Sequence, residues 1–328
     1  MSREATARAC SNIALVKYWG KRDARLNLPA RGSFSLTLAG LTTTTTVRWV
    51  DEPQHTLSIG GVATDTASLG KAGRVLDLVR SLAGTSASAA VTSTNDFPTG
   101  AGLASSASGL AALTLAATRA AGLELDRAAL SRLARIGSGS ACRSLFGGFV
   151  EWQAGVRDDG EDSIAVPVFG PEHWDLRVVV AVVSDRRKAV NSTNGMEHTR
   201  ETSPFHVPYL DTVDNDLREA KRAVEERDLV GLGRVAERSC LRMHAAMMGA
   251  DPALVYLRPE TWQVLDAVHA LRASGVPLFF TIDAGPNVKV FTLPAAVDTI
   301  REALLELPAV GRLIVASPGP AAECLGAR

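Results

Sequence analysis

The sequence is poor in cysteine, and its cysteines follow no recognisable pattern. Among 328 residues there are only four, Cys10, Cys142, Cys240 and Cys324, and no two of them form a Cys-x-x-Cys pair. This scatter indicates neither a zinc site nor a disulfide framework, so we expect reduced thiols that are mostly structural. A catalytic Cys/His pair stays open as the less favoured alternative, because spacing alone does not decide it.

The chain also lacks an excess of one charge and a long apolar segment. Its 35 basic and 35 acidic side chains cancel, which argues against a general nucleic-acid or acidic-membrane binder but still allows a local basic pocket. The longest aliphatic run, Val178 to Val183, is far shorter than the roughly 20 residues that cross a bilayer, and no apolar signal segment follows Met1. We therefore expect a soluble, cytoplasmic protein without nucleic-acid or membrane partners.

Hydrophobic residues make up 46% of the chain, enough for a sizeable core in one large domain or two ordinary ones. Strands are predicted at residues 42–50, 55–62, 89–94, 178–183, 278–283, 288–293 and 312–316. We expect the strand at 55–62 to pair with that at 42–50, and the strand at 312–316 to be the last of the chain. Helices are predicted at 71–82, from a glycine-rich loop to about 121, at 126–136, at 215–248 with a break near Gly231 and Gly233, and at 261–274. Elements mixed in this way favour an α+β fold, and lengths suggest two domains, 1–180 and 181–328.

The most distinctive loop runs from Pro98 to Ser108 and consists largely of Gly, Ala and Ser. It leads into a predicted helix, whose first N–H groups are unsatisfied and whose N-terminus carries a partial positive charge. Small residues let a ligand approach this backbone closely, so the segment suits phosphates, although a capped and closely packed helix would need the same residues. The Gly-x-x-x-x-Gly-Lys-Ser/Thr pattern of P-loop proteins is absent from the sequence.

Two further segments carry basic residues beside small or aromatic ones. Segment 12–23 is an apolar strand that leads to Lys17, Lys21 and Arg22, and it could hold a polyanionic molecule or form an exposed basic loop. In segment 137–144, alternating Gly and Ser expose backbone donors and hydroxyls, and Arg143 could grip a phosphate or carboxylate with two hydrogen bonds. A plain Gly/Ser loop is the alternative there.

Two other segments carry weaker signals. Lys188 and the hydroxyl-rich segment 191–196 follow a predicted strand and could add a phosphate contact, or form a solvated, capped loop. Asp283 closes an apolar strand just before the turn 284–287. At that place its carboxylate could act as a general base or orient a hydroxyl, or it could be an ordinary Asx-turn residue.

In this order and at these separations, the segments resemble those of the mevalonate diphosphate decarboxylase family within the GHMP kinase superfamily. The resemblance rests on segments 12–23, 95–108, 138–152 and 283–287, with weaker matches at 192–204 and 244–257, and extends from about residue 8 to residue 292. The segments around Lys17 and Arg143 are quite specific to this family. The loop at 98–108 is shared by GHMP kinases generally and discriminates less.

The resemblance implies a fold and a reaction. The N-terminal domain of the chain would be similar to ribosomal protein S5 domain 2, and the C-terminal domain would be ferredoxin-like. The active site would lie in the cleft between the two domains. Members of the family are commonly homodimers. ATP would phosphorylate the tertiary 3-hydroxyl of mevalonate 5-diphosphate with the help of Mg²⁺. The 3-phosphate would then leave as CO₂ is lost, giving isopentenyl diphosphate, ADP and phosphate in isoprenoid biosynthesis.

The resemblance also implies which residues do this, without specifying metal ligands. Asp283, Lys17 and Arg143 would be catalytic. The substrate would be bound by Tyr18, Lys21, Ser138, Ser140, Arg143 and Ser192, and ATP by Gly100, Gly102, Leu103, Ala104, Ser105, Ser106, Ser108 and Lys188.

One departure from the family pattern keeps other activities open. Where the family usually has Leu/Ile-Pro-x-Asn-Ser-Ser, residues 28–33 are Leu-Pro-Ala-Arg-Gly-Ser, so Arg31 and Gly32 replace a polar pair that we expect near the substrate pocket. Decarboxylation of mevalonate 5-phosphate, or a kinase that phosphorylates a mevalonate-type hydroxyl without decarboxylation, are the alternatives. A silent binding protein is disfavoured because Asp283, Lys17, Lys21 and Arg143 are all present. A nucleic-acid binder is disfavoured because the net charge is zero and no basic aromatic stripe is present in the sequence.

Overall fold

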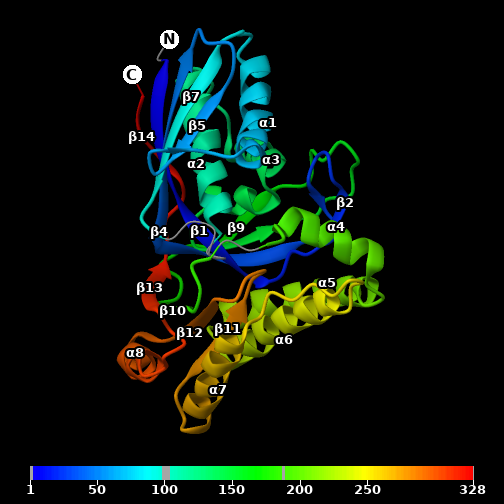
Figure 1. Cartoon of the computed structure of the whole chain (residues 1–328), viewed down its shortest axis with the longest axis vertical. Helices are drawn as coiled ribbons and strands as arrows, with labels where there is room; N and C mark the ends of the chain where they lie inside the picture. Colours follow the sequence, from blue (N-terminus) through cyan, green and yellow to red (C-terminus); the bar gives the residue numbers. More distant parts are fainter. Residues whose placement is uncertain (1–2, 98–103, 187–188, 328) are drawn as a thin grey trace.

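A computed structural model describes residues 3–97, 104–186 and 189–327 as one large mixed sheet flanked by helices (Figure 1). The strands are β1 (Glu4–Val16), β2 (Lys21–Asp23), β3 (Leu28–Pro29), β4 (Ser33–Val50), β5 (Thr56–Ile59), β6 (Val62–Ala63), β7 (Ser88–Asn95), β8 (Phe149–Trp152), β9 (Ala165–Phe169), β10 (Arg177–Val182), β11 (Leu278–Ile282), β12 (Val288–Thr292), β13 (Arg312–Pro318) and β14 (Glu323–Ala327). The helices are α1 (Thr66–Leu82), α2 (Ser105–Ala120), α3 (Arg127–Gly137), α4 (Ser192–Thr202), α5 (His206–Glu225), α6 (Leu229–Met248), α7 (Pro259–Ala273) and α8 (Val297–Leu305), with short 3₁₀ turns η1 (Gly139–Leu145) and η2 (Pro294–Ala296). The α+β class predicted from the sequence is confirmed.

Strand β4 connects the whole sheet. The strand order is β11-β12-β10-β13-β4-β7-β5-β6, with β1 pairing both β4 and β14, and β8 pairing β4 and β9. The link between the two halves is short, since β13 pairs β4 only at Ser317 and Pro318. The last strand, β14, returns to the first, β1, so the two ends of the chain lie close together at the top of Figure 1.

The lower half of the sheet is covered on both faces. Val178 and Val180 of β10 pack with α5 and α6, whereas Val179 faces α7 and α8. This alternation follows from the two-residue period of a strand and explains why β10 is an almost unbroken apolar run. In the upper half, α1, α2 and α3 bury their apolar faces against the sheet in a separate cluster.

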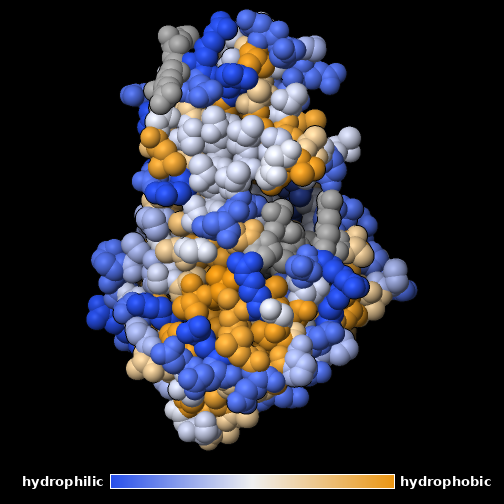
Figure 2. Space-filling model, turned by 60° about the vertical axis from the view of Figure 1, so that its left-hand side comes forward, coloured by the Kyte–Doolittle hydropathy of each residue, from blue (hydrophilic) through white to orange (hydrophobic). Residues whose placement is uncertain are grey.

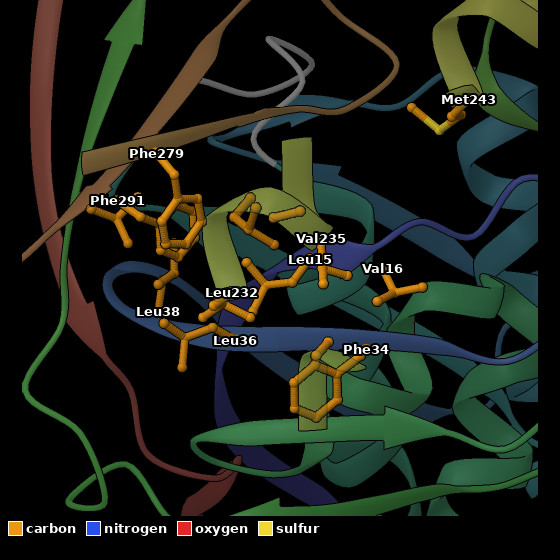
Figure 3. Packing of buried hydrophobic residues seen from close by; sticks show 14 of the residues in the cluster. Leu15, Val16, Phe34, Leu36, Leu38, Leu232, Val235, Met243, Phe279 and Phe291 are labelled. Carbon is orange, nitrogen blue, oxygen red and sulfur yellow. The ribbon is translucent and has the colours of Figure 1, made fainter. Parts of the chain in front are cut away.

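A central core joins the two halves. Leu36 and Leu38 of β4 lie beside Leu232 of α6, with Phe279 and Phe291 of the neighbouring strands close by (Figure 3). The two phenyl rings stack with their centroids 4.8 Å apart. Truncating one such buried side chain to Ala typically costs about 2–5 kcal/mol, so this core fixes the relative positions of the elements that border the site below.

Three sequence-based expectations need correction. The strand predicted at 55–62 does not pair with 42–50: its first part, β5, pairs in parallel with β7, because α1 carries the chain back across the sheet. The long helix breaks at Arg227, with a φ of 54°, not at the glycines, and Gly233 instead allows close packing on Phe279. The strand at 312–316 is not the last, because β14 follows it.

Several other predicted features are present. Asp126 accepts a hydrogen bond from the Ala129 N–H at the start of α3, and Gly122, with a φ of 73°, follows the end of α2. All four cysteines have free thiols, three of them buried. Within the described residues, no helix is long and apolar enough to cross a membrane. Residue 180, the expected domain boundary, lies inside β10.

Candidate active site

A cleft of about 660 Å³ opens between the upper and lower halves of the molecule. Its walls come from β1, α1, α2 and η1 on one side, and from α4, α6 and the turn after β11 on the other. The expected site residues that border it are Lys17, Tyr18, Lys21, Ala104, Ser105, Ser106, Ser138, Ser140, Arg143, Ser192 and Asp283. Side chains up to 266 positions apart in the sequence therefore meet in one cleft.

The remaining expected residues lie elsewhere. Gly100, Gly102, Leu103 and Lys188 fall outside the described residues. Ser108 is fully buried behind the cleft wall, where its hydroxyl lies 2.7 Å from the Thr43 hydroxyl. This hydroxyl supports the packing of α2 on β4 and does not border the cleft.

Asp283 stands at the end of β11 with an ammonium group against each carboxylate oxygen. Lys17 Nζ lies 2.6 Å from Oδ1, and Lys289 Nζ lies 3.3 Å from Oδ2. Burial alone would raise the pKa of Asp283, but the two lysines together hold the pKa of this carboxyl below its usual range. The carboxylate is therefore ionised at neutral pH, fixed in orientation, and able to accept a hydrogen bond from a hydroxyl in the cleft.

The backbone of Lys17 is fixed by the opposite half of the molecule. Its N–H donates to the Ser239 hydroxyl of α6 at 3.0 Å, and its carbonyl accepts from the Tyr209 hydroxyl of α5 at 2.9 Å. The next residue but one, Trp19, donates its indole N–H to Thr199 of α4. Three helices of the lower half thus position the end of β1 and, directly after it, Lys17.

Arg143 is held by η1 as a buried cation at the cleft wall. Its Nε donates to Asn12 Oδ1 at 3.1 Å, and its Nη1 donates to the Ser33 hydroxyl. Arginine keeps its charge even when buried, so this site presents a fixed positive charge. Nearby, the Tyr18 hydroxyl is buried and has no hydrogen-bond partner among the described residues, and the ring packs edge-on against Trp152. An unsatisfied phenol beside a fixed guanidinium suits an anionic oxygen of a ligand.

A second group of cations surrounds Lys21. Burial, followed by the charges of Arg74 and Lys71 on α1, lowers the pKa of Lys21 to about 8, against a weaker opposing effect of Glu197. Lys21 Nζ donates to Asn27 Oδ1 at 2.6 Å. The positive charge in this corner of the cleft therefore disfavours the protonated form of Lys21 in the free protein. It favours the binding of a multiply charged anion.

The start of α2 forms the other end of the cleft. Ala104 has a left-handed φ of 57° and makes no side-chain cap, and it borders the cleft, so the partial positive charge of the helix N-terminus lies at the cleft surface. Ser105 and Ser106 follow at the cleft surface. Leu57 and Ile59 of β5 also line the cleft and provide an apolar surface of the kind that a nucleobase needs.

No group of three His, Cys, Asp or Glu side chains that could hold a metal ion occurs among the described residues. The oxygen donors that border the cleft are instead hydroxyls, amide oxygens and two carboxylates, those of Asp65 and Asp283. This set fits Mg²⁺ bound mainly through ligand phosphates and water, which is the usual arrangement for that ion.

Arg31 and Gly32, the departure from the family pattern, do not border the cleft. Arg31 points to α5, where it pairs with Asp211 and Asp214 at 3.8 and 3.7 Å. Gly32 lies against the Trp152 carbonyl, where a Cβ would approach to 2.9 Å. The chain turns Arg31 toward α5, whereas the next residue after the pair, Ser33, accepts a hydrogen bond from Arg143 at the cleft wall.

Four site residues were missed by the sequence analysis: Asn12, Lys71, Arg74 and Lys289. Lys71 and Arg74 are three positions apart on one face of a predicted helix, a spacing that could have indicated a basic stripe. Lys289 interrupts the apolar strand 288–293, and a lone charge in such a strand was the available signal.

Comparisons with known proteins agree with this geometry. Residues 9–165 match the model of the diphosphomevalonate decarboxylase-like N-terminal domain, and residues 178–311 match that of the mevalonate 5-diphosphate decarboxylase C-terminal domain. The human diphosphomevalonate decarboxylase is 39% identical over 90% of this chain and 78% of its own length.

Solved structures of similar proteins superpose over almost the whole chain. The mevalonate diphosphate decarboxylase of Staphylococcus aureus has a TM-score of 0.93 and 41% identity, covering 99% of both chains. That of Enterococcus faecalis has a TM-score of 0.90 and 40% identity over 99% of both chains. A further structure, described as a complex with MVAPP, AMPPCP and magnesium, has a TM-score of 0.92 and 41% identity with the same coverage. This chain belongs to the diphosphomevalonate decarboxylase family.

Proposed function

We propose that this protein catalyses the ATP-dependent decarboxylation of mevalonate 5-diphosphate to isopentenyl diphosphate, ADP, phosphate and CO₂. The observation that carries the proposal is the ionised Asp283, held by Lys17 at the bottom of a cleft that also presents Arg143. A carboxylate that accepts a hydrogen bond, beside fixed positive charges, is the arrangement needed to direct a hydroxyl at a phosphoryl group. The family relationship supplies the identity of that hydroxyl.

The two ends of the cleft divide the ligands between them. The N-terminus of α2, with Ser105 and Ser106, would hold the ATP phosphates, and the wall formed by β5 would face the base. The basic corner around Lys21 would hold the diphosphate of the substrate. Ser138, Ser140 and Tyr18 would position the substrate, and Ser192, at the N-terminus of α4, would lie near the transferring group.

The reaction then follows from where the charges lie. Asp283 accepts the hydrogen bond of the 3-hydroxyl and takes its proton, as the hydroxyl oxygen attacks the γ-phosphorus of ATP and the bond to ADP breaks. The C–O bond of the new 3-phosphate breaks next, and the electrons of the C–CO₂ bond form the double bond as CO₂ leaves. Arg143 and Lys17 bind the anionic groups and exclude water from the reacting centre. Mg²⁺, when bound, would neutralise charge on the phosphates.

The alternatives are a decarboxylase of mevalonate 5-phosphate and a kinase whose phosphorylated product is stable. The corner formed by Lys21, Lys71 and Arg74 favours the diphosphate, because three cations bind a more highly charged anion more strongly. Arg31 gives no support to a changed substrate, since its side chain pairs with α5.

The test is a paired assay of the purified protein with ATP and Mg²⁺. We expect equal amounts of ADP and CO₂ from mevalonate 5-diphosphate and a much lower rate from mevalonate 5-phosphate. Preference for the monophosphate, ADP without CO₂, or no turnover of either substrate would each contradict the proposal.

Variants extend this assay to the assigned carboxylate. We expect Asp283→Asn, which keeps the shape but removes the charge, to lower kcat by about 10²–10⁴-fold while an ATP analogue still binds. Asp211→Asn is the matched control, because Asp211 contacts Arg31 outside the cleft. A near-normal rate for Asp283→Asn would refute the role given to this residue.

We further propose a homodimer in the cytoplasm, built from two-domain subunits that divide near residue 180, at the connection before β10. Figure 2 supports an interface, because a broad apolar patch rimmed by polar residues covers the lower half of one face. Sedimentation analysis would test the dimer, since a mass of about twice the subunit's 34.6 kDa is expected.

A further inference from the structure

Lys289 is a buried cation for which the proposed reaction gives no reason. It lies on β12 with its side chain fully buried, and it does not border the cleft. Its Nζ lies 3.3 Å from Asp283 Oδ2 and donates to the Asn287 carbonyl at 3.2 Å. Burying an ammonium group is costly unless it is well paired, so a lysine in this strand calls for an explanation beyond packing.

The two lysines of Asp283 differ in what else they can reach. Lys17 borders the cleft, whereas Lys289 projects from strand β12 and contacts the carboxylate without bordering the cleft. An anionic ligand in the cleft can therefore compete with Asp283 for Lys17 but not for Lys289.

The other ionisable groups around this carboxylate cannot replace either lysine. Cys240 and His244 face it from α6: burial raises the pKa of Cys240, and burial, followed by the charge of Lys17, lowers the pKa of His244 to about 4. Both are therefore neutral near pH 7. Arg143 adds its charge from η1, but its guanidinium is bound to neutral side chains on the other side of the cleft.

The cluster therefore has one positive charge more than its carboxylate needs. If Lys17 turned toward the phosphoryl oxygens of ATP, a lone lysine–aspartate pair would leave Asp283, whose side chain is 25% exposed, as a partly buried anion without a counter-ion. Partial burial disfavours the charged form of such a carboxyl and raises its pKa, which favours protonation. A protonated Asp283 would donate its hydrogen bond and could no longer accept one from the substrate hydroxyl.

We propose that Lys289 is a positioning residue that keeps Asp283 ionised and in place, so that Lys17 is free to turn to the transferring phosphoryl group. This role rests on the proposed function. It divides the work of two similar side chains: Lys17 serves the reacting groups, and Lys289 serves only the carboxylate.

The first test compares Lys289→Met and Lys289→Arg with the wild type over a range of pH. In Lys289→Met, Asp283 loses its permanent counter-ion, so the ratio of its kcat to that of the wild type should rise at least ~10-fold between about pH 5.5 and about pH 8. In Lys289→Arg, which keeps the charge, this ratio should be independent of pH. Taking ratios cancels the titration of the ligands and of every other group that the proteins share.

Thr281→Val is the matched control, because Thr281 pairs with Lys289 in the β11–β12 register, is equally buried and has no charge. It should leave the pH dependence of kcat unchanged. A pH-independent ratio for Lys289→Met, with a rate loss that arginine does not repair, would mean that Lys289 only fills space, and the proposal would be overturned.

A second test needs no variant and covers the case in which Lys289→Met does not fold. In a crystal structure of the wild-type protein with mevalonate 5-diphosphate and a non-hydrolysable ATP analogue, Lys17 Nζ should have left Asp283, while Lys289 stays within about 3.5 Å of it. Departure of Lys289, or retention of both contacts, would overturn the proposal. Failure of the wild type to release CO₂ from the diphosphate would instead refute the proposed function.

Discussion

At the scale of single residues, the sequence indicates which side chains carry reactive groups better than it indicates which side chains contact one another. Asp283 was found because a carboxylate at the end of an apolar strand is a recognisable position, and Lys17 because it follows an apolar strand. Their contact across 266 positions could not be inferred from either pattern alone, because it depends on how the two halves pack. Lys289 was missed for the opposite reason: its partner is near in sequence, but a charge inside a strand of valines conflicts with the apolar pattern that predicts the strand.

Lys21 gives a prediction at the same scale. The pKa of Lys21 in the free protein, about 8, lies below the usual value for lysine, so the ammonium group loses its proton as the pH rises through that value. A bound diphosphate favours the charged form and raises the pKa, so binding should take up protons near pH 8, and affinity should fall as pH rises past it. Calorimetry in buffers of different ionisation enthalpy measures this uptake.

The variants for this experiment are simple to choose. Lys21→Met should abolish the proton uptake and weaken binding of mevalonate 5-diphosphate by at least ~10-fold. Lys221→Met should change neither, because Lys221 pairs with Glu151 away from the cleft. Proton uptake that persists in Lys21→Met would show that another group titrates.

At the scale of elements, local patterns predicted most helices and strands but not how they pair. The strand at 55–62 was recognised, yet its neighbour was wrongly taken to be 42–50, since sequence patterns do not show that α1 carries the chain over the sheet and inserts β7 between them. The break between α5 and α6 was misplaced because Gly231 and Gly233 attract attention, while the residue with the positive φ is Arg227. Tertiary contacts such as that of Gly233 with Phe279 explain glycines that do not end a helix.

The attachment of β1 to the lower helices gives the prediction for this scale. Tyr209→Phe removes the hydroxyl that donates to the Lys17 carbonyl, and leaves that buried carbonyl without its partner at a cost of about 1–3 kcal/mol. We expect kcat to fall about 3–30-fold as Lys17 loses its fixed position, with little change in KM for ATP. Steady-state kinetics and thermal unfolding measure the two effects separately.

Tyr256→Phe controls for the chemical change itself. The Tyr256 hydroxyl also donates to a backbone carbonyl, the partly buried one of Val190, but Tyr256 does not border the cleft. It should lower the stability to a similar extent and leave kcat unaltered. Equal losses of kcat in both variants would mean that general loosening, and not the position of Lys17, is responsible.

At the scale of the whole molecule, the division of the chain at residue 180 was inferred from length alone. Length cannot reveal that β4 serves both parts of the sheet, or that the chain ends where it began, with β14 beside β1. The apolar run at 178–183, by contrast, identified β10 correctly, because a strand covered on both faces needs apolar residues at every position. The active site depends on both halves together, since neither alone supplies both Lys17 and Asp283.

This return of the chain predicts that the N-terminal domain does not fold alone. A fragment of residues 1–172 lacks β14, so the edge of β1 is left unpaired and Arg8 loses its ion-pair partner, Glu323. Unpaired edges favour aggregation, so we expect this fragment to be insoluble or to unfold without a cooperative transition in circular dichroism. Co-production with residues 173–328, which keep β10 intact and restore β14, should give a soluble complex. Cooperative unfolding of the fragment on its own would show that the upper half is independent of the chain's end.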